Sequence, residues 1–137
     1  MKNHNPDGVW PVPEQFERIY SHAIEMDLDT HRELHVSGQV GIAPDGGIVD
    51  SFSGQLLQAL KNVEALLEVA RMSKGDIVRV TYYLTRREDL PRLSEVRASH
   101  WDGIRPAVTT VIVAGLAKPE LLVEVEVLAQ KIKATQV

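Results

Sequence analysis

One segment near the C-terminus restricts the possible folds of this chain more than any other. From Leu121 to Ala129, an uninterrupted apolar set alternates with a set that contains two carboxylates. Successive side chains of a β-strand point to opposite faces of a sheet, so the two sets lie on opposite sides. One face has Leu121, Val123, Val125, Val127 and Ala129, and the other has Leu122, Glu124, Glu126 and Leu128. The sequence therefore predicts a strand with one buried face and one face that mixes leucines with acids.

The rest of the chain predicts one α+β domain in the order β-β-α-β-α-β-β. Apolar residues recur at helical spacing over 53–72, where Ser53 is placed to cap the start, and a more polar helix over 87–101 is entered through Asp89 and Pro91. β-branched and alternating segments predict the strands, at 20–27, 33–41, 76–85 and on both sides of a short loop in 105–130. Turn and extended signals fill residues 1–18, so we expect an arm without a helix and with Trp10 as its anchor. The predicted domain is 19–133, followed by a tail at 134–137.

Two helices cover only one face of a five-stranded sheet. We expect that face to take apolar residues such as Val78 and Val80. The other face is too apolar for water and too polar for an ordinary core, which favours a symmetric oligomer that packs these faces together. Its predicted members are His35, Ser37, Arg79, Thr81, Tyr83, Thr109, Val111, Leu122, Glu124, Glu126 and Leu128.

Composition excludes several functional classes. A formal net charge of −4 over 137 residues gives no basic field for nucleic acid or anionic lipid. With no cysteine, thiolate catalysis and Cys-based metal sites are absent. No apolar run approaches the ~20 residues of a membrane span, and the first residues lack the apolar core of a secretory signal. We therefore expect a cytoplasmic protein without a cofactor and without a nucleic-acid or membrane partner.

Among candidate chemical groups, the two acids of the C-terminal strand come first. Glu126 is expected to pair with Arg79 or with a basic group of another subunit. For Glu124 an ion pair and a general base of raised pKa are equally open. The sequence HRELH places two histidines and a glutamate on one strand face, but solvated side chains are favoured over a metal site. The sequence contains no G-x-S-x-G motif, so it gives no indication of a serine hydrolase.

Three segments, in order and at their spacing, resemble the RidA family, also called YjgF or L-PSP, over roughly residues 20–130. The segments are VSGQVG, QALKNVEALLEVARMSKGDIVRVTYYLTRREDLPRLSEV and RPAVTTVIVAGLAKPELLVEVEVLAQ. The resemblance implies a chorismate mutase-like fold and a homotrimer with a central barrel and clefts between subunits, which would hold a small-molecule ligand.

The resemblance also implies hydrolysis of reactive enamines or imines, such as 2-aminoacrylate, to keto acids and ammonia. Glu124 matches the family glutamate that holds or activates water. His22 falls where these deaminases usually carry a tyrosine, Ser94 lies near a frequent asparagine, and Gly38 matches the glycine of the SGQ strand.

One position departs from the family pattern. Archetypal members carry an arginine two residues after the proline of a PAR motif, and it grips the substrate carboxylate. Here Val108 occupies that position, and Arg105 lies on the other side of Pro106. Arg105 is a candidate for a relocated anchor, although a structural or rim role is favoured. Without this grip, 2-aminoacrylate is disfavoured as the substrate.

These observations leave three functional hypotheses. The first is a deaminase of a small imine or enamine, with Glu124 positioning water and His22, Ser94, Thr109 and the backbone at Gly38 shaping the pocket. The second is a non-catalytic small-molecule-binding or interaction protein on the same trimer. The third is an endoribonuclease or translation inhibitor, which the acidic charge balance disfavours.

Overall fold

The computed structural model describes residues 1–134, so 135–137 of the predicted tail lie outside the described residues. The chain forms one six-stranded sheet and two α-helices. The strands are β1 (Lys2–His4), β2 (Ala23–Asp27), β3 (His31–Val40), β4 (Ile77–Leu84), β5 (Ala107–Ile112) and β6 (Val123–Ile132), and the helices are α1 (Phe52–Val69) and α2 (Leu90–His100). The predicted α+β class and element order are confirmed, with β1 as an additional edge strand.

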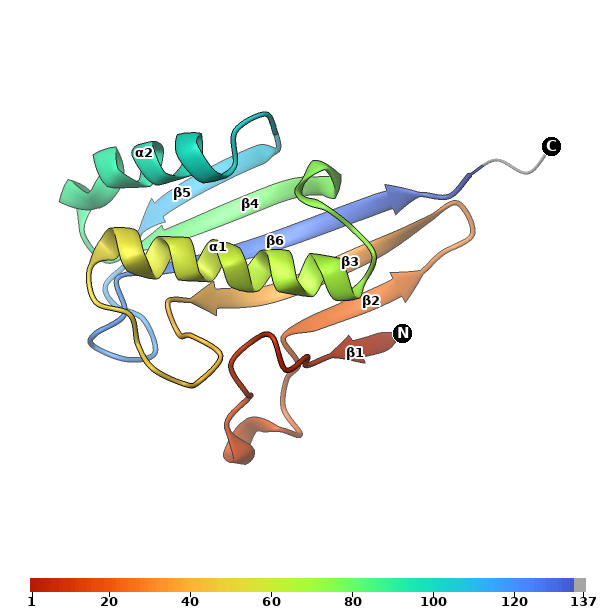
Figure 1. The fold of residues 1–137 in the computed structure, drawn as a ribbon, viewed down its shortest axis with the longest axis horizontal. Helices are drawn as coiled ribbons and strands as arrows, with labels where there is room; N and C mark the ends of the chain where they lie inside the picture. Colours follow the sequence, from red (N-terminus) through yellow and green to blue (C-terminus); the bar gives the residue numbers. More distant parts are fainter. Residues whose placement is uncertain (135–137) are drawn as a thin grey trace.

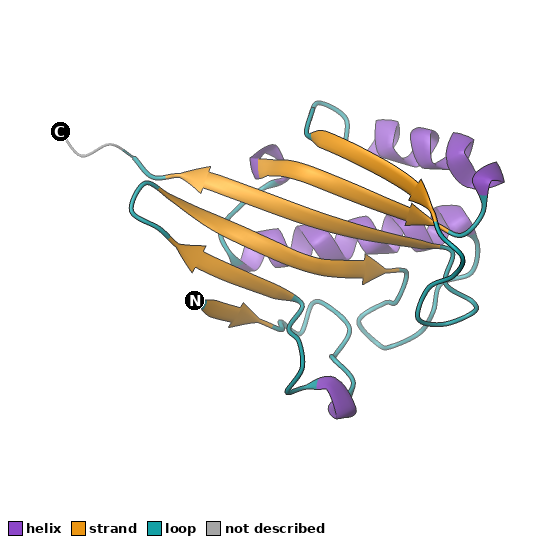
Figure 2. Ribbon diagram, turned by 180° about the vertical axis from the view of Figure 1, so that it is seen from behind, coloured by secondary structure: helices purple, strands orange, loops and turns teal. Residues whose placement is uncertain are grey.

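Both helices lie on the same side of the sheet, as the sequence predicted. The strand order is β1-β2-β3-β6-β4-β5, and only the β4–β5 pair is parallel. Figure 1 shows α1 over the centre of the sheet and α2 near the β5 edge, and the reverse view in Figure 2 shows a sheet face that no helix covers. The apolar set of β6 is buried against the helices, whereas Glu126 on its other face is exposed. The buried face and the open face of β6 are therefore the ones that the alternation predicted.

The start of α1 differs from the prediction by two residues. Ser51, rather than Ser53, caps the helix, because its hydroxyl accepts a hydrogen bond from the backbone N–H of Gly54 at 3.1 Å. The helix begins at Phe52, whose ring is buried in the core. Burial of Phe52 fixes the first turn, and the preceding serine is then the residue whose hydroxyl reaches the free N–H groups.

Two residues lie on a different side from the one predicted. Val78 was expected under the helices, but it is 42% exposed, because a bulge between Ile77 and Arg79 shifts the register of β4 against β6. Leu122 was expected on the open face, but it precedes β6 and packs against the main core. Strict alternation fails at both places because the backbone is not a regular strand there.

The N-terminal arm is ordered against the domain. β1 pairs with β2, and a 3₁₀ turn at Glu14–Phe16 interrupts the segment in which no helix was expected. Trp10 is half-buried and packs against two groups of buried apolar residues, the main core under the helices and a smaller cluster of Val40, Ile42 and Leu121. This agrees with its predicted role as an anchor. Across residues 1–134, no helix has the length and apolar character needed to cross a membrane.

Candidate functional site

Glu124 lines a cavity of about 520 Å³ between the arm and the C-terminal end of β3, which we call the Glu124 cavity. One wall is the arm and the other is formed by β3, β6 and the loops that flank them. The lining residues are Trp10, Pro11, Pro13, Phe16, Tyr20, Ser37, Gly38, Val40, Ile42, Gly46, Ala117, Lys118, Leu121 and Glu124. A single half-buried carboxylate therefore lies in a cavity whose walls are mostly apolar, and its volume is within the usual range for small-molecule sites.

A bulge in β3 brings the Glu124 carboxyl against the backbone. The register of β3 against β6 shifts between Val36 and Gln39, so Gly38 lies within the irregular segment. A Cβ atom added to Gly38 would lie 2.6 Å from both Cδ and Oε1 of Glu124. Only a glycine leaves room for this carboxyl in its observed position. The sequence prediction that grouped Gly38 with Glu124 therefore coincides with a direct contact.

The surroundings raise the pKa of Glu124. Burial contributes most, since it disfavours the charged carboxylate, and the negative charge of Glu126 adds to the effect. Tyr20 faces the same environment, because burial and the charge of Glu124 raise the pKa of its phenol. A carboxyl whose pKa is moved toward neutrality is better suited to proton transfer than an exposed one.

Tyr20, and not His22, is the aromatic residue that reaches this cavity. His22 is only 1% exposed and does not line the cavity, although its ring packs against the lining residue Trp10. Its Nε2–H donates to the Trp10 carbonyl at 2.6 Å, and its Nδ1 accepts from Nε2 of Gln39 at 3.1 Å. Sequence reasoning began the first strand at residue 20, but β2 begins at Ala23. The family resemblance had placed His22 at the position of the usual tyrosine, whereas the structure brings the tyrosine two residues earlier into the cavity.

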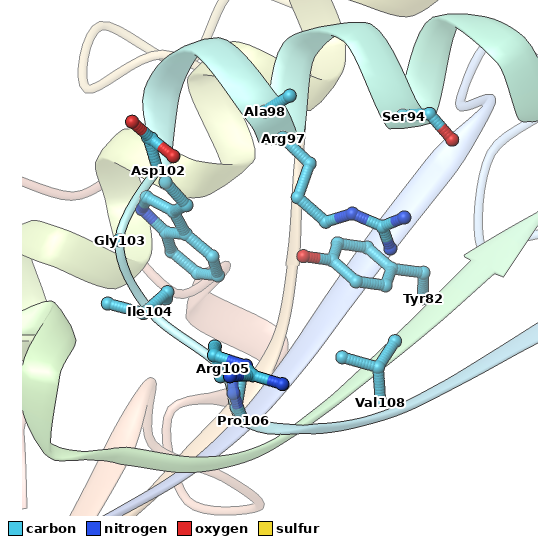
Figure 3. Close-up of a pocket in the computed structure, with 11 residues that line it drawn as sticks. Tyr82, Ser94, Arg97, Ala98, Asp102, Gly103, Ile104, Arg105, Pro106 and Val108 are labelled. Atoms are coloured by element: carbon cyan, nitrogen blue, oxygen red, sulfur yellow. The ribbon is translucent and has the colours of Figure 1, made fainter.

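Ser94, Arg105 and Val108 lie together in a second cavity, of about 310 Å³, which we call the α2–β5 cavity. It shares no lining residue with the Glu124 cavity. In Figure 3 the Arg97 guanidinium lies over the ring of Tyr82, 5.5 Å from its centroid, and Arg105 extends from the loop before β5 toward the same space. β5 begins only at Ala107, so Arg105 belongs to the loop before the strand, and it lines the same cavity as Val108.

The remaining predicted residues lie on the open face of the sheet. Thr109 is exposed and pairs in register with Thr81, away from both cavities. Glu126 accepts a hydrogen bond from the Tyr83 hydroxyl at 3.0 Å. No ion pair joins it to Arg79 within residues 1–134, although both line a shallow groove on this face.

The histidines of HRELH interact with the glutamate between them. Nε2 of His31 and Nε2 of His35 lie 3.2 and 3.1 Å from the two oxygens of Glu33. In the described part of the chain, no group of three or more His, Asp or Glu side chains is arranged to hold a metal ion.

Comparison with known proteins gives consistent results in sequence and in structure. The family model described as "Endoribonuclease L-PSP" matches residues 14–131. A RutC family protein of Aquifex aeolicus is 36% identical over 115 residues, which cover 82% of this chain and 88% of the relative. A mouse protein named 2-iminobutanoate/2-iminopropanoate deaminase is 31% identical over 116 residues, covering 80% of this chain and 79% of that protein. The crystal structure of RidA from an Antarctic Psychrobacter superposes with a TM-score of 0.84 and 27% identity, covering 94% of this chain and 98% of that one.

Proposed function

The chain belongs to the RidA family, whose model is described as Endoribonuclease L-PSP, and we propose that it hydrolyses a reactive imine or enamine with Glu124 as the group that positions water. The observation that carries the proposal is the half-buried carboxylate of raised pKa in a mostly apolar cavity. The names of the mouse and rat relatives, both 2-iminobutanoate/2-iminopropanoate deaminases, support the same reaction class.

The proposed reaction needs one base and one proton donor, and a single carboxyl supplies both in turn. Glu124 accepts a proton from water as the water oxygen adds to the imine carbon, and returns that proton to the imine nitrogen, which gives a carbinolamine. The carboxylate then takes the hydroxyl proton of the carbinolamine and passes it to the nitrogen as the C–N bond breaks, so that ammonia leaves and a carbonyl product forms. An enamine first tautomerises to the imine. Apolar walls limit competing water around the carboxyl and keep its pKa raised.

The proposed site combines the two cavities across a subunit boundary. In a single chain, Glu124 and Gly38 lie in one cavity, while Ser94, Arg105 and Val108 lie in the other. The family resemblance implies a homotrimer with clefts between subunits, and the uncovered sheet face supplies a surface for such packing. We expect a molecular mass of three chains in light scattering. A stable single chain in solution would contradict this arrangement.

The assay is ammonia release from an imine that a flavin oxidase generates in the same solution. Oxidation of an amino acid gives a 2-imino acid, which carries a carboxylate, and oxidation of a primary amine gives a neutral imine. Release faster than spontaneous hydrolysis is the expected result. No acceleration with either class would contradict the proposed activity and, if the same molecules bind, would favour the alternative of a binding protein without turnover.

Val108 is expected to limit the use of carboxylated imines. Because it lines the α2–β5 cavity, a Val108→Arg substitution adds a guanidinium there. One charge-assisted hydrogen bond changes affinity by about ten- to a hundredfold, so kcat/KM for 2-imino acids should rise by that factor relative to neutral imines. A Val108→Gln variant, which adds length without charge, is the control. An equal change for both substrate classes would show that residue 108 does not recognise the carboxylate.

The rate should depend on pH through Glu124. The base form is lost as pH falls, so kcat/KM should decline on the acid side, at a pH above the ordinary glutamate value. The charge of Glu126 contributes to the raised pKa, so a Glu126→Gln substitution should move this acid limb to lower pH. Initial rates across a pH series check both points. An acid limb that stays unchanged in Glu126→Gln would exclude Glu124 as the titrating group.

A further inference from the structure

We infer that the N-terminal arm makes the Glu124 cavity selective for ligands that carry a large apolar substituent, of branched-chain or aromatic size. This inference rests on the proposed function for the reaction, but not for the binding preference. It concerns the arm segment 10–20, which lies outside β6 and supplies Trp10, Pro11, Pro13, Phe16 and Tyr20 to the cavity lining.

The chemistry of the two walls defines the kind of group that fits between them. On the arm side the wall contains two aromatic rings, Phe16 and Tyr20, together with the indole and prolines of the WPVP segment. Val40, Ile42 and Leu121 face them from the domain. Polar side chains of the lining are few: Ser37, Lys118 and Glu124, together with the Tyr20 hydroxyl and the Trp10 indole N–H. A ligand that directs its reacting carbon to Glu124 therefore places its substituent against apolar carbon, where burial of apolar surface favours binding.

The arm wall is held in place by buried contacts before any ligand binds. His22 connects three separate parts of the chain, because its backbone N–H donates to the Asn5 side chain at 2.8 Å and its ring bonds Trp10 and Gln39. Val9 and Val12 are buried on either side of Trp10. The Trp10 end of the wall therefore loses little conformational freedom on binding, whereas residues 14–19, which include Phe16, are exposed.

Phe16 is the residue of this wall that contributes little to the hydrophobic core. It ends the 3₁₀ turn Glu14–Phe16 and remains 40% exposed, although it is a large apolar residue. Its ring lies 6.2 Å from the ring of Tyr20, centroid to centroid. An aromatic side chain that contributes little to the core but lines the cavity is available to contact a ligand. Ile19, on the same arm, is 72% exposed and does not line the cavity.

The size of the Glu124 cavity also favours a ligand with a large apolar substituent. The Glu124 cavity, at about 520 Å³, is larger than the α2–β5 cavity of about 310 Å³. An imine with only a methyl substituent leaves most of the apolar wall in contact with water. An isobutyl or benzyl substituent removes more of that wall from water, so affinity should increase with substituent size until the cavity is filled.

The test compares one substituent series in three proteins. Imines with methyl, isobutyl and benzyl substituents are generated by oxidases, and kcat/KM is measured for wild type, Phe16→Ala and the control Ile19→Ala. We expect the benzyl-to-methyl ratio to exceed about tenfold in wild type and Ile19→Ala, and to fall about tenfold in Phe16→Ala. A ratio near one in wild type, or an equal ratio in Phe16→Ala and wild type, would overturn the inference.

A binding measurement separates this inference from the proposed reaction. Calorimetric titration with the corresponding carbonyl products, in the same substituent series, reports preference without turnover. Tighter binding of the benzyl compound that weakens in Phe16→Ala supports the arm as the selective wall even if no imine is hydrolysed, in which case only the proposed reaction fails. Hydrolysis that is accelerated equally for all substituents, with equal affinities, leaves the reaction standing and overturns the inference.

Discussion

A Glu124→Gln substitution is expected to lower kcat/KM for imine hydrolysis by about 10²- to 10⁴-fold, the usual contribution of a positioned general base. Glutamine keeps the size of the side chain and its contact with Gly38, but it cannot accept a proton from water. The loss should appear mainly in kcat, because the apolar walls that bind the substituent are unchanged. Ammonia release under saturating and limiting imine checks this split.

Glu126→Gln is the matched control, since it removes the other acid of the same strand face. Glu126 bonds Tyr83 on the open face and does not line the cavity, so this variant should retain most activity near neutral pH. Comparable losses in the two variants would indicate a shared structural role for the acids. Wild-type rates in Glu124→Gln would remove the catalytic assignment.

The Glu124→Gln substitution should not lower the stability of the folded protein at neutral pH. Burial raises the pKa of Glu124 above its unfolded value, so its contribution to folding is fully present below the unfolded pKa and is lost as pH rises through the folded pKa. At neutral pH the native carboxylate therefore carries a desolvation cost that glutamine lacks. Thermal unfolding near pH 7 should show a midpoint for Glu124→Gln equal to or above that of wild type.

A Gly38→Ala substitution is expected to lower kcat/KM by about 10²-fold without unfolding the protein. The new methyl group would lie 2.6 Å from the Glu124 carboxyl, so the carboxyl must move. Gly38 does not have a positive φ, and the atoms that the methyl meets belong to the end of a flexible side chain. The cost therefore falls on the position of the base, and a displacement of about 1 Å has an effect of this size.

Gly115→Ala provides the control for Gly38→Ala, because an added Cβ at Gly115 meets no atom within 4 Å. Rates and thermal midpoints of the two variants, measured together, distinguish a displaced base from a general loss of structure. A Gly38→Ala protein with normal rates would show that the carboxyl tolerates the shift. The contact between the Glu124 carboxyl and the backbone at Gly38 would then have no effect on catalysis.

Local pattern was sufficient for those parts of the site that depend on strand alternation. Glu124 and Glu126 share a strand face because their spacing is two residues, and no packing changes that relation within a regular strand. The contact between Glu124 and Gly38 was suggested by family resemblance alone, and its close geometry depends on a bulge in β3. His22 was likewise assigned to the cavity by family resemblance, and the structure shows that Tyr20 lines it instead.

By itself, the sequence determined the α+β class, the order of the elements, the buried and open faces of β6 and the family, because these depend on periodicity and on motifs within short segments. Tertiary structure decided that Val78 faces outward, that Ser51 caps α1, that the arm closes one side of the Glu124 cavity, and that Arg105 and Val108 line a different cavity. The physical reason is that contacts between distant segments set the bulges, the strand starts and the path of the arm. The residue pattern within one segment carries no information about these contacts.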